Sequence, residues 1–289
     1  MKVRSLLLLL AVSLLCACSN SGDSSPAPVD QASALAAQLS ASHTPANEVF
    51  IQLLLDNELG SDPLYLIEYR QLKDDTVETQ VLLDNYAEAL NEKLASVGAY
   101  VGFENTVLRQ VSIPDERVWH EVTGIYFPSP QALLDLLQDA GYQQAVQNKY
   151  SATLGLHSFL ITLLVDELPA TEPDKNAFYM ANLNQHRERA LYADGTDHGL
   201  TGREADALYT DRMLAEVLPT IGAYPVLAGE YRHLLLGTDA DWDTFALVRY
   251  PSLPEFFGMI STPLFQELVV NKGAGLARTS AMMTSFDLL

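Results

Sequence analysis

Cysteine is almost absent from this chain of 289 residues, because Cys16 and Cys18 are its only two cysteines. Everything after residue 18 therefore lacks a disulfide, a cysteine-based metal site and a cysteine nucleophile. Domains that follow must fold by burying apolar side chains alone, which domains of about 110 residues can do.

Basic residues are scarce as well. The chain has 17 lysines and arginines against 37 aspartates and glutamates, and its formal net charge is −20. A nucleic-acid partner is disfavoured, because phosphate binding needs basic side chains that displace counterions. A broad electrostatic contact with anionic lipid is disfavoured for the same reason. The composition predicts a soluble acidic protein.

Long hydrophobic runs are also missing. The apolar run at the N-terminus covers only residues 6–15, which is too short to cross a bilayer of ~30 Å as a helix. Lys2 and Arg4 precede this run, as in a removable signal peptide. Residues 1–18 are therefore predicted to be a targeting segment and not part of a domain.

The end of this segment, Leu-Cys-Ala-Cys at residues 15–18, resembles a bacterial lipobox. The resemblance implies cleavage before Cys18 and attachment of lipid to its thiol and new amino group; Cys16 lacks a small residue before it and is the weaker candidate. Ser19 in place of aspartate implies sorting to the outer membrane, with the protein facing the periplasm. An ordinary secretory signal with two incidental cysteines is the alternative. Residues 19–46, rich in Ser, Ala and Pro, are predicted to be a disordered tether.

The rest of the chain repeats itself. Gly-Ala-Tyr at 98–100 returns at 222–224, and residues 119–149 match 242–272 without gaps at seven identical positions, which include Trp119 with Trp242. Two copies of one unit are therefore predicted, at 47–168 and 176–289, joined by a linker at 169–175. The shared tryptophans are expected to pack in a core or between sheets.

Each copy is predicted to have the order βαββαβ, and the first copy has an additional strand at 49–55. In the first copy, strands are expected at 64–69, 100–111, 118–127 and 156–165, and helices at 79–94 and 130–150, the second one interrupted at Gly141. In the second copy, strands are expected at 177–183, 223–236, 242–250 and 279–286, and helices at 203–218 and 253–270, the second one interrupted at Pro263.

The order βαββαβ is that of the ferredoxin-like motif, in which both helices cover one face of the sheet. The other face needs a partner, which a covalently linked second copy supplies. The predicted fold class is α+β, with two ferredoxin-like domains packed as an internal dimeric α+β barrel. This internal pseudo-dimer removes the need to dimerise, so a monomer is expected.

The second copy resembles a known bacterial family. Residues 178–183 read Phe-Tyr-Met-Ala-Asn-Leu. Three further motifs follow in order: Arg-Glu-Arg-Ala at 187–190, Gly-Arg-Glu-Ala at 202–205 and Val-Arg-Tyr-Pro-Ser at 248–252. Together they resemble domain of unknown function 1330, within the dimeric α+β barrel superfamily. The first copy resembles it more loosely. The resemblance implies the fold and no established activity.

Four polar residues of the second copy are the candidate ligand-binding residues: Asn182, Tyr209, Arg232 and Arg249. They are expected to converge in a cleft between sheet and helices, where Arg249 would bind a carboxylate or enolate oxygen. The alternative is that Arg249 pairs with an acid in solvent and that Asn182 bonds to neighbouring backbone. In the first copy Glu68 and Tyr126 take the places of Asn182 and Arg249, so the second copy is the candidate for activity.

No catalytic motif, phosphate-binding loop or dinucleotide fingerprint occurs, and no cofactor is expected. The segment 194–198, Asp-Gly-Thr-Asp-His, is interpreted as a polar turn, so no metal site is expected. The leading hypothesis is a lipid-anchored envelope protein that binds a small, partly apolar molecule in its barrel. The alternatives are a cofactor-independent oxygenase or isomerase of an enolisable substrate, and a structural or scaffolding lipoprotein.

Overall fold

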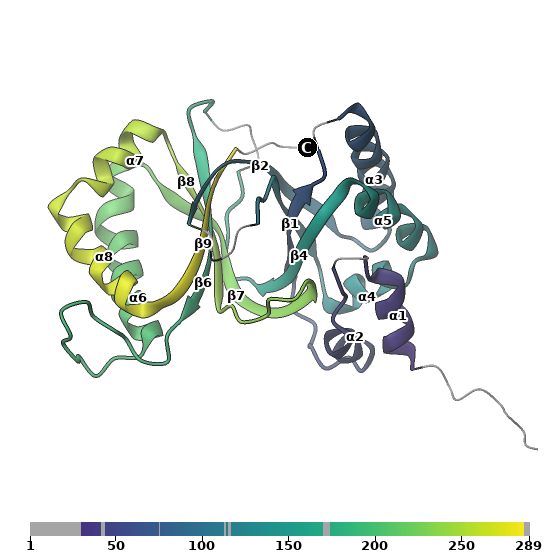
Figure 1. Cartoon of the computed structure of the whole chain (residues 1–289), viewed down its shortest axis with the longest axis horizontal. Coiled ribbons are helices and arrows are strands. Elements are labelled where there is room, and N and C mark those ends of the chain that lie inside the picture. The colour runs from purple at the N-terminus through teal and green to yellow at the C-terminus, as the bar shows by residue number, and fades with distance from the viewer. Residues whose placement is uncertain are drawn as a thin grey trace, which may run out of the picture.

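The computed structural model describes residues 30–41, 44–74, 76–112, 114, 117–169 and 174–285. The strands of these residues form one sheet in the order β4-β1-β3-β2-β9-β6-β8-β7-β5, and a further pairing of β4 with β7 closes the sheet into a barrel. Every pairing is antiparallel. Figure 1 shows the barrel in the middle, with one layer of helices on either side.

The two halves of the chain share the order strand, helix, two strands, two helices and strand, to which the N-terminal half adds two helices at its start and a short strand at its end. The N-terminal half contains α1 (Gln31–Leu39), α2 (Glu48–Leu55), β1 (Leu64–Leu72), α3 (Val77–Ser96), β2 (Tyr100–Ser112), β3 (Glu121–Phe127), α4 (Pro130–Gln138), α5 (Ala140–Ala152), β4 (Thr153–Thr162) and β5 (Val165–Asp166). The C-terminal half contains β6 (Phe178–His186), α6 (Gly202–Arg212), β7 (Tyr224–Leu236), β8 (Thr244–Tyr250), α7 (Leu253–Ile260), α8 (Pro263–Gly275) and β9 (Leu276–Thr284). Three pairings join the halves: β2 with β9, β4 with β7 and β5 with β7.

The predicted α+β fold is therefore confirmed. Interruption of the last helix at the same place in both halves is confirmed too. Asp139 accepts a hydrogen bond from the Tyr142 amide at 2.7 Å and begins α5, and Thr262 does the same for Phe265 at 3.2 Å and begins α8. Gly98 and Gly222 both have positive φ angles, 72° and 69°, at the turn before β2 and β7, a conformation that glycine adopts without strain.

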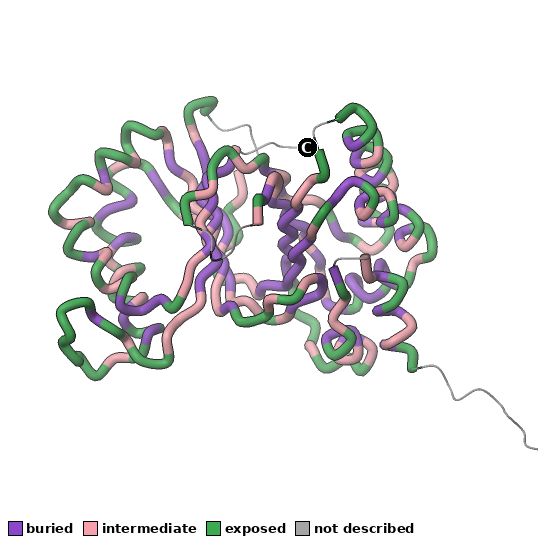
Figure 2. Tube along the Cα trace, in the orientation of Figure 1, coloured by how far each residue is buried: buried purple, intermediate pink, exposed green. Residues whose placement is uncertain are grey.

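The interior of the barrel is filled with side chains. Alternate residues of β1, namely Tyr65, Ile67 and Tyr69, point inward and are at most 1% exposed. The corresponding residues of β6 are Tyr179, Ala181 and Leu183. Trp119 and Trp242 belong to this same buried cluster, as predicted for a shared core position. Figure 2 shows the buried core running through the centre of the molecule.

The first correction concerns the tether, which was predicted to extend to residue 46. Residues 31–39 form α1, which buries Ala32, Leu35, Ala36 and Leu39 against the helices of the N-terminal half. These four positions share one helical face, which two small alanines complete. Residues 31–39 therefore belong to the N-terminal half, and residues 19–29 of the tether lie outside the described residues.

The second correction concerns residues 49–55, which form the helix α2 and not a strand. Six apolar residues, interrupted only by Gln52, fit a buried strand and a buried helix equally well. The local signals favour a helix, because the Asn47 side chain accepts a hydrogen bond from the Phe50 amide at 3.2 Å. Phe50, Ile51 and Leu54 face the same core as α1.

The signal segment 1–18, with Cys18, lies outside the described residues, as do residues 170–173 of the predicted linker. Within the described residues, no helix is long and apolar enough to cross a membrane.

Candidate functional site

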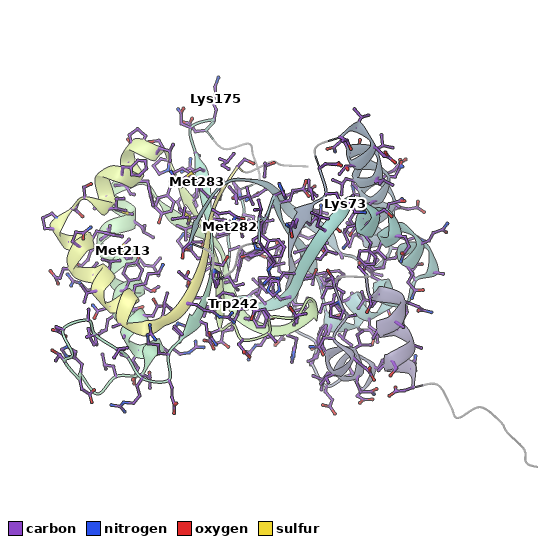
Figure 3. All side chains as sticks on the ribbon, viewed as in Figure 1. Lys73, Lys175, Met213, Trp242, Met282 and Met283 are labelled. Carbon is purple, nitrogen blue, oxygen red and sulfur yellow. The ribbon has the colours of Figure 1, made fainter. Side chains whose placement is uncertain are left out.

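The C-terminal half contains a cavity of about 560 Å³ between its sheet and its helices. Most of the wall comes from the outer face of β6, β7, β8 and β9 and from the helical segments that cover it, and Val111 of β2 with Leu164 and Val165 at β5 complete it. Much of it is apolar, and six of the contributing residues are Met180, Met213, Val248, Tyr250, Met259 and Phe265. Figure 3 shows Met213 among these helices, and Met282 and Trp242 on the barrel side. The volume is in the range of small-molecule sites, about 300–1,000 Å³.

Polar groups gather in one part of this wall. Asn182 and Asn184 come from β6, Asp206 and Tyr209 from α6, and Lys272 from α8. Asn182 and Asn184 alternate with Ala181 and Leu183, which face the barrel, so the pleat of β6 directs both amides toward the helices. The Asn182 amide donates to the Met180 carbonyl at 3.1 Å, and the Asn184 amide oxygen accepts from the Thr279 hydroxyl at 2.7 Å.

Lys272 is the cation of this wall. Its Nζ lies 5.3 Å from the centre of the Tyr209 ring, and no described residue forms a hydrogen bond or an ion pair with it. Burial lowers the pKa of the Lys272 ammonium, and the Asp206 charge partly offsets this. Burial also raises the pKa of Tyr209 to about 12, with a further contribution from Asp206. A negatively charged partner would therefore stabilise the charged form of Lys272.

Asp206 is bonded elsewhere. Its Oδ2 lies 3.2 Å from His186 Nε2, while its Oδ1 is buried and has no hydrogen-bond partner among the described residues. On the other side of the imidazole, Asp243 Oδ2 lies 3.3 Å from His186 Nδ1. Asp206 is part of the cavity wall, but its unbonded Oδ1 is itself buried.

The cavity is bounded by an irregular helical segment. After α6 the chain makes a π-helical turn at Met213–Val217 and a 3₁₀ turn at Leu218–Ile221, whereas the N-terminal half has the uninterrupted helix α3. Tyr86 and Tyr209 are 123 residues apart, and Gly98 and Gly222 are 124 apart, so the C-terminal half has one extra residue in this stretch. A π turn accommodates one such residue, and π turns are frequent at functional sites.

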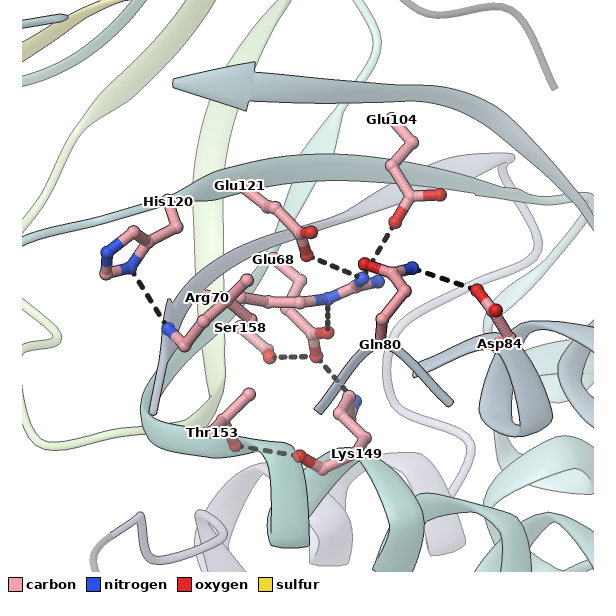
Figure 4. Close-up of polar contacts among 11 residues, drawn as sticks. Glu68, Arg70, Gln80, Asp84, Glu104, His120, Glu121, Lys149, Thr153 and Ser158 are labelled. Atoms are coloured by element: carbon pink, nitrogen blue, oxygen red, sulfur yellow. Dashed lines mark hydrogen bonds and ion pairs between the residues drawn. The ribbon is translucent and has the colours of Figure 1, made fainter. Parts of the chain in front are cut away.

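The matching region of the N-terminal half is filled by an ion-pair network, which Figure 4 shows. Glu68 is bonded to Arg70 at 2.9 Å, to Lys149 at 2.8 Å and to the Ser158 hydroxyl at 2.8 Å. Arg70 also pairs with Glu104 at 2.8 Å and with Glu121 at 3.1 Å. Burial alone would raise the pKa of Glu68, but Lys149 and Arg70 lower it to about 2. This half is a packed core, in keeping with the expectation that the second half is the candidate for activity.

Two of the four residues predicted from the sequence lie in the cavity wall. Asn182 is half-buried on β6, and Tyr209 is half-buried on α6. The expectation that Asn182 bonds to neighbouring backbone is also met, through the Met180 carbonyl. The structure therefore brings these two together, on the helix-facing side of the sheet.

The other two do not reach this cavity. Arg249 follows Val248 on β8 and precedes Tyr250, both of which face the helices, so alternation directs Arg249 to the opposite side. Its guanidinium lies 5.7 Å from the centre of the Tyr224 ring. Arg232 is exposed, lies 3.1 Å from Glu230 and lines a separate cavity of about 310 Å³, because that part of β7 has crossed to pair with β4.

Sequence reasoning missed Lys272, Asp206 and Asn184. The signal that could have found Lys272 is the recurrence of Asn-Lys at 148–149 and 271–272. In the prediction this recurrence served only as a match between the two copies. The barrel pocket of the leading hypothesis also needs correction. The barrel interior is packed, and the cavity lies outside it, beneath the helices.

The polar segment 194–198 has the bonding of turns. Asp194 accepts from the Thr196 amide at 2.9 Å and Asp197 from the Gly199 amide at 2.8 Å. In the part of the chain that the structure describes, no three His, Cys, Asp or Glu side chains are grouped to hold a metal ion.

No protein-family model matches the chain and no curated protein matches it, so the resemblance to domain 1330 stays a prediction. Among solved structures, a protein of unknown function from Rhodopseudomonas palustris is 32% identical, over 38% of this chain and 82% of that protein, with a TM-score of 0.34. An anthrone oxidase-like protein is 12% identical, over 78% of this chain and 92% of that one, with a TM-score of 0.50. A dimeric protein of ferredoxin-like fold from Bacteroides fragilis is 11% identical, over 35% of this chain and 96% of that one, with a TM-score of 0.25.

Proposed function

The chain belongs to the same family as the Rhodopseudomonas palustris protein and has the dimeric α+β barrel fold, and from this premise we propose that its C-terminal half binds a small, mainly apolar molecule. The observation that carries the proposal is the cavity of about 560 Å³ beneath α6, α7 and α8. The same space in the N-terminal half is occupied by a bonded network. An apolar wall with a few convergent polar groups is the usual form of a ligand site.

The wall is suited to an apolar body of adaptable shape. Met180, Met213 and Met259 contribute unbranched thioether side chains, which adjust to irregular ligands. Tyr250, Phe256 and Phe265 contribute aromatic faces. The polar groups of Asn182, Tyr209 and Lys272 would then orient one end of the molecule.

Filling the cavity tests this function. Ala246 lies on β8 opposite Asn182 and lines the cavity, so Ala246→Phe is expected to exclude the ligand. Ala207→Phe is the matched control, because Ala207 is exposed on α6 and is not part of the wall. Native mass spectrometry of protein purified from its own host should show a bound small molecule in the wild type and in Ala207→Phe, and none in Ala246→Phe. An unliganded wild type that also fails to bind any apolar probe would refute the proposal.

A second candidate function is a cofactor-independent oxygenase or isomerase of an enolisable substrate. Asp206 favours it, because its carboxylate belongs to the cavity wall and has one oxygen without a hydrogen-bond partner among the described residues, and a carboxylate in this position can act as a proton acceptor. Lys272, Asn182 or Tyr209 would stabilise the enolate oxygen. In D₂O the bound molecule should then exchange a C–H next to its carbonyl with the wild type and not with Asp206→Asn. No exchange with the wild type would exclude this function.

For its location, we propose a lipoprotein anchored through Cys18 in the outer membrane, with the barrel in the periplasm and with copies related to domain 1330. The support is the sequence of residues 1–19 and the ordered motifs of the second copy. The mass of the mature N-terminal peptide checks the lipid, and an unmodified peptide would overturn it. The scaffold alternative would be favoured by a cross-linked envelope partner without any bound ligand.

A further inference from the structure

The two halves can be aligned residue by residue through their strand pairings. Glu68 pairs with Thr123 and Ser158, and Asn182 pairs with Ala246 and Ala281, which stand 123 positions after those two. Asn182 thus takes the place of Glu68, and Ala281 the place of Ser158. By the same register, Asn184 replaces Arg70 on the first strand, and Ala228 replaces Glu104 on the strand that follows the first helix.

The lysine and tyrosine of this network are retained. Lys149 Nζ lies 4.9 Å from the centre of the Tyr86 ring, and Lys272 Nζ lies 5.3 Å from the centre of the Tyr209 ring. Lys149 is bonded to the Glu68 carboxylate, whereas Lys272 lines the same cavity as Asn182 and has no bonded carboxylate among the described residues. The C-terminal half has therefore kept the cation and lost the anion.

The lost side chains account for the space. In the N-terminal half these four positions carry Glu68, Arg70, Glu104 and Ser158. In the C-terminal half they carry smaller side chains, all of which line the cavity: Asn182, Asn184, Ala228 and Ala281. Lys272 is half-buried, and burial penalises its charge, which the nearby Asp206 offsets only in part. A ligand that brings a carboxylate to this position would restore the arrangement that Lys149 and Glu68 have in the other half.

Asp206, the acidic residue of the wall, does not take that role. It bonds to His186 and forms no ion pair with Lys272. The place of the Glu68 carboxylate is next to Asn182 on β6, whereas Asp206 is on α6. Lys272 is thus left for an incoming anion.

We propose that the ligand is an apolar carboxylic acid, bound as its carboxylate by Lys272 beside Asn182, with its apolar body against the methionines and aromatic rings. This rests on the proposed function of the cavity and names the class of ligand. The place of the head group is that of the Glu68 carboxylate in the N-terminal half. A charge-assisted hydrogen bond in a partly buried site corresponds to about 10- to 100-fold in affinity.

The test uses four probes in titration calorimetry, namely decanoate with decan-1-ol, and 1-naphthaleneacetate with 2-(1-naphthyl)ethanol. We expect the wild type to bind each carboxylate at least about 10-fold more tightly than its alcohol. Lys272→Met should lose this preference. Arg249→Met is the matched control, because it removes a cation that lies outside the cavity, and it should keep the preference.

Asn182→Glu supplies a second variant. Its carboxylate would stand where Glu68 stands and would pair with Lys272, so carboxylate binding should be lost while the melting temperature is unchanged or higher. Equal affinity for acid and alcohol, an unchanged preference in Lys272→Met, or a cationic co-purified ligand would overturn the inference and leave the cavity proposal standing. Absence of binding by all four probes, together with an unliganded native mass, would overturn both.

Discussion

Gly229→Ala is expected to open the seam between β4 and β7 and to lower the free energy of unfolding by about 2–4 kcal/mol. A Cβ added to Gly229 would lie 1.7 Å from the backbone oxygen of Thr162, which no side-chain movement can relieve. Glycine in a strand often marks such a close approach of another backbone. The strands must separate, and hydrogen bonds that close the barrel would be lost.

Gly273→Ala is the matched control for this experiment. A Cβ at Gly273 would meet nothing within 4 Å, and the residue lies within α8. Alanine there is expected to stabilise the protein by about 0.4–1 kcal/mol. Urea unfolding, followed by the fluorescence of the buried Trp119 and Trp242, measures both variants. A Gly229→Ala protein as stable as the wild type would show that the seam is not closed as described.

Glu68→Ala is expected to lower the free energy of unfolding by about 3–5 kcal/mol, because Lys149 and Arg70 would stay buried without the carboxylate that pairs with both of them. Glu68→Gln keeps the volume and removes the charge, so most of this loss should remain. Glu88→Gln is the control, because Glu88 is exposed on α3, and it should change the stability by less than about 0.5 kcal/mol.

The same carboxylate makes the stability depend on pH. Its pKa is about 2 in the folded protein against 4.5 for an ordinary glutamate, so the folded state is stabilised above pH 4.5. This stabilisation, of about 3 kcal/mol, is lost as the pH falls from 4.5 to 2. Burial raises the pKa of Glu121, which acts in the opposite direction, so the comparison of Glu68→Gln with the wild type isolates Glu68. Equal acid sensitivity of the two proteins would contradict the assignment.

The expected elements match the structure where local signals decide them. Proline or a capping side chain begins α4, α7 and α8, glycine ends the turns before β2 and β7, and short apolar runs mark β1 and β6. These signals act over a few residues, so one sequence is sufficient to read them. The predictions for residues 31–39 and 49–55 were wrong. The alanines of α1 and the short apolar run of α2 fit more than one conformation, and only packing against the core selects the helix.

The candidate site, too, was predictable from the sequence only in part. The sequence alone determined that the two halves share one order of elements, that Glu68 and Asn182 correspond, and that the second half is the one to examine. Only the tertiary structure decided that the barrel interior is packed, that Arg232 and Arg249 point away, and that Lys272 lies in the wall with Asn182. The reason is physical, because the size of a cavity depends on the volumes of side chains from many strands and helices that are far apart in the sequence, and no local pattern determines it.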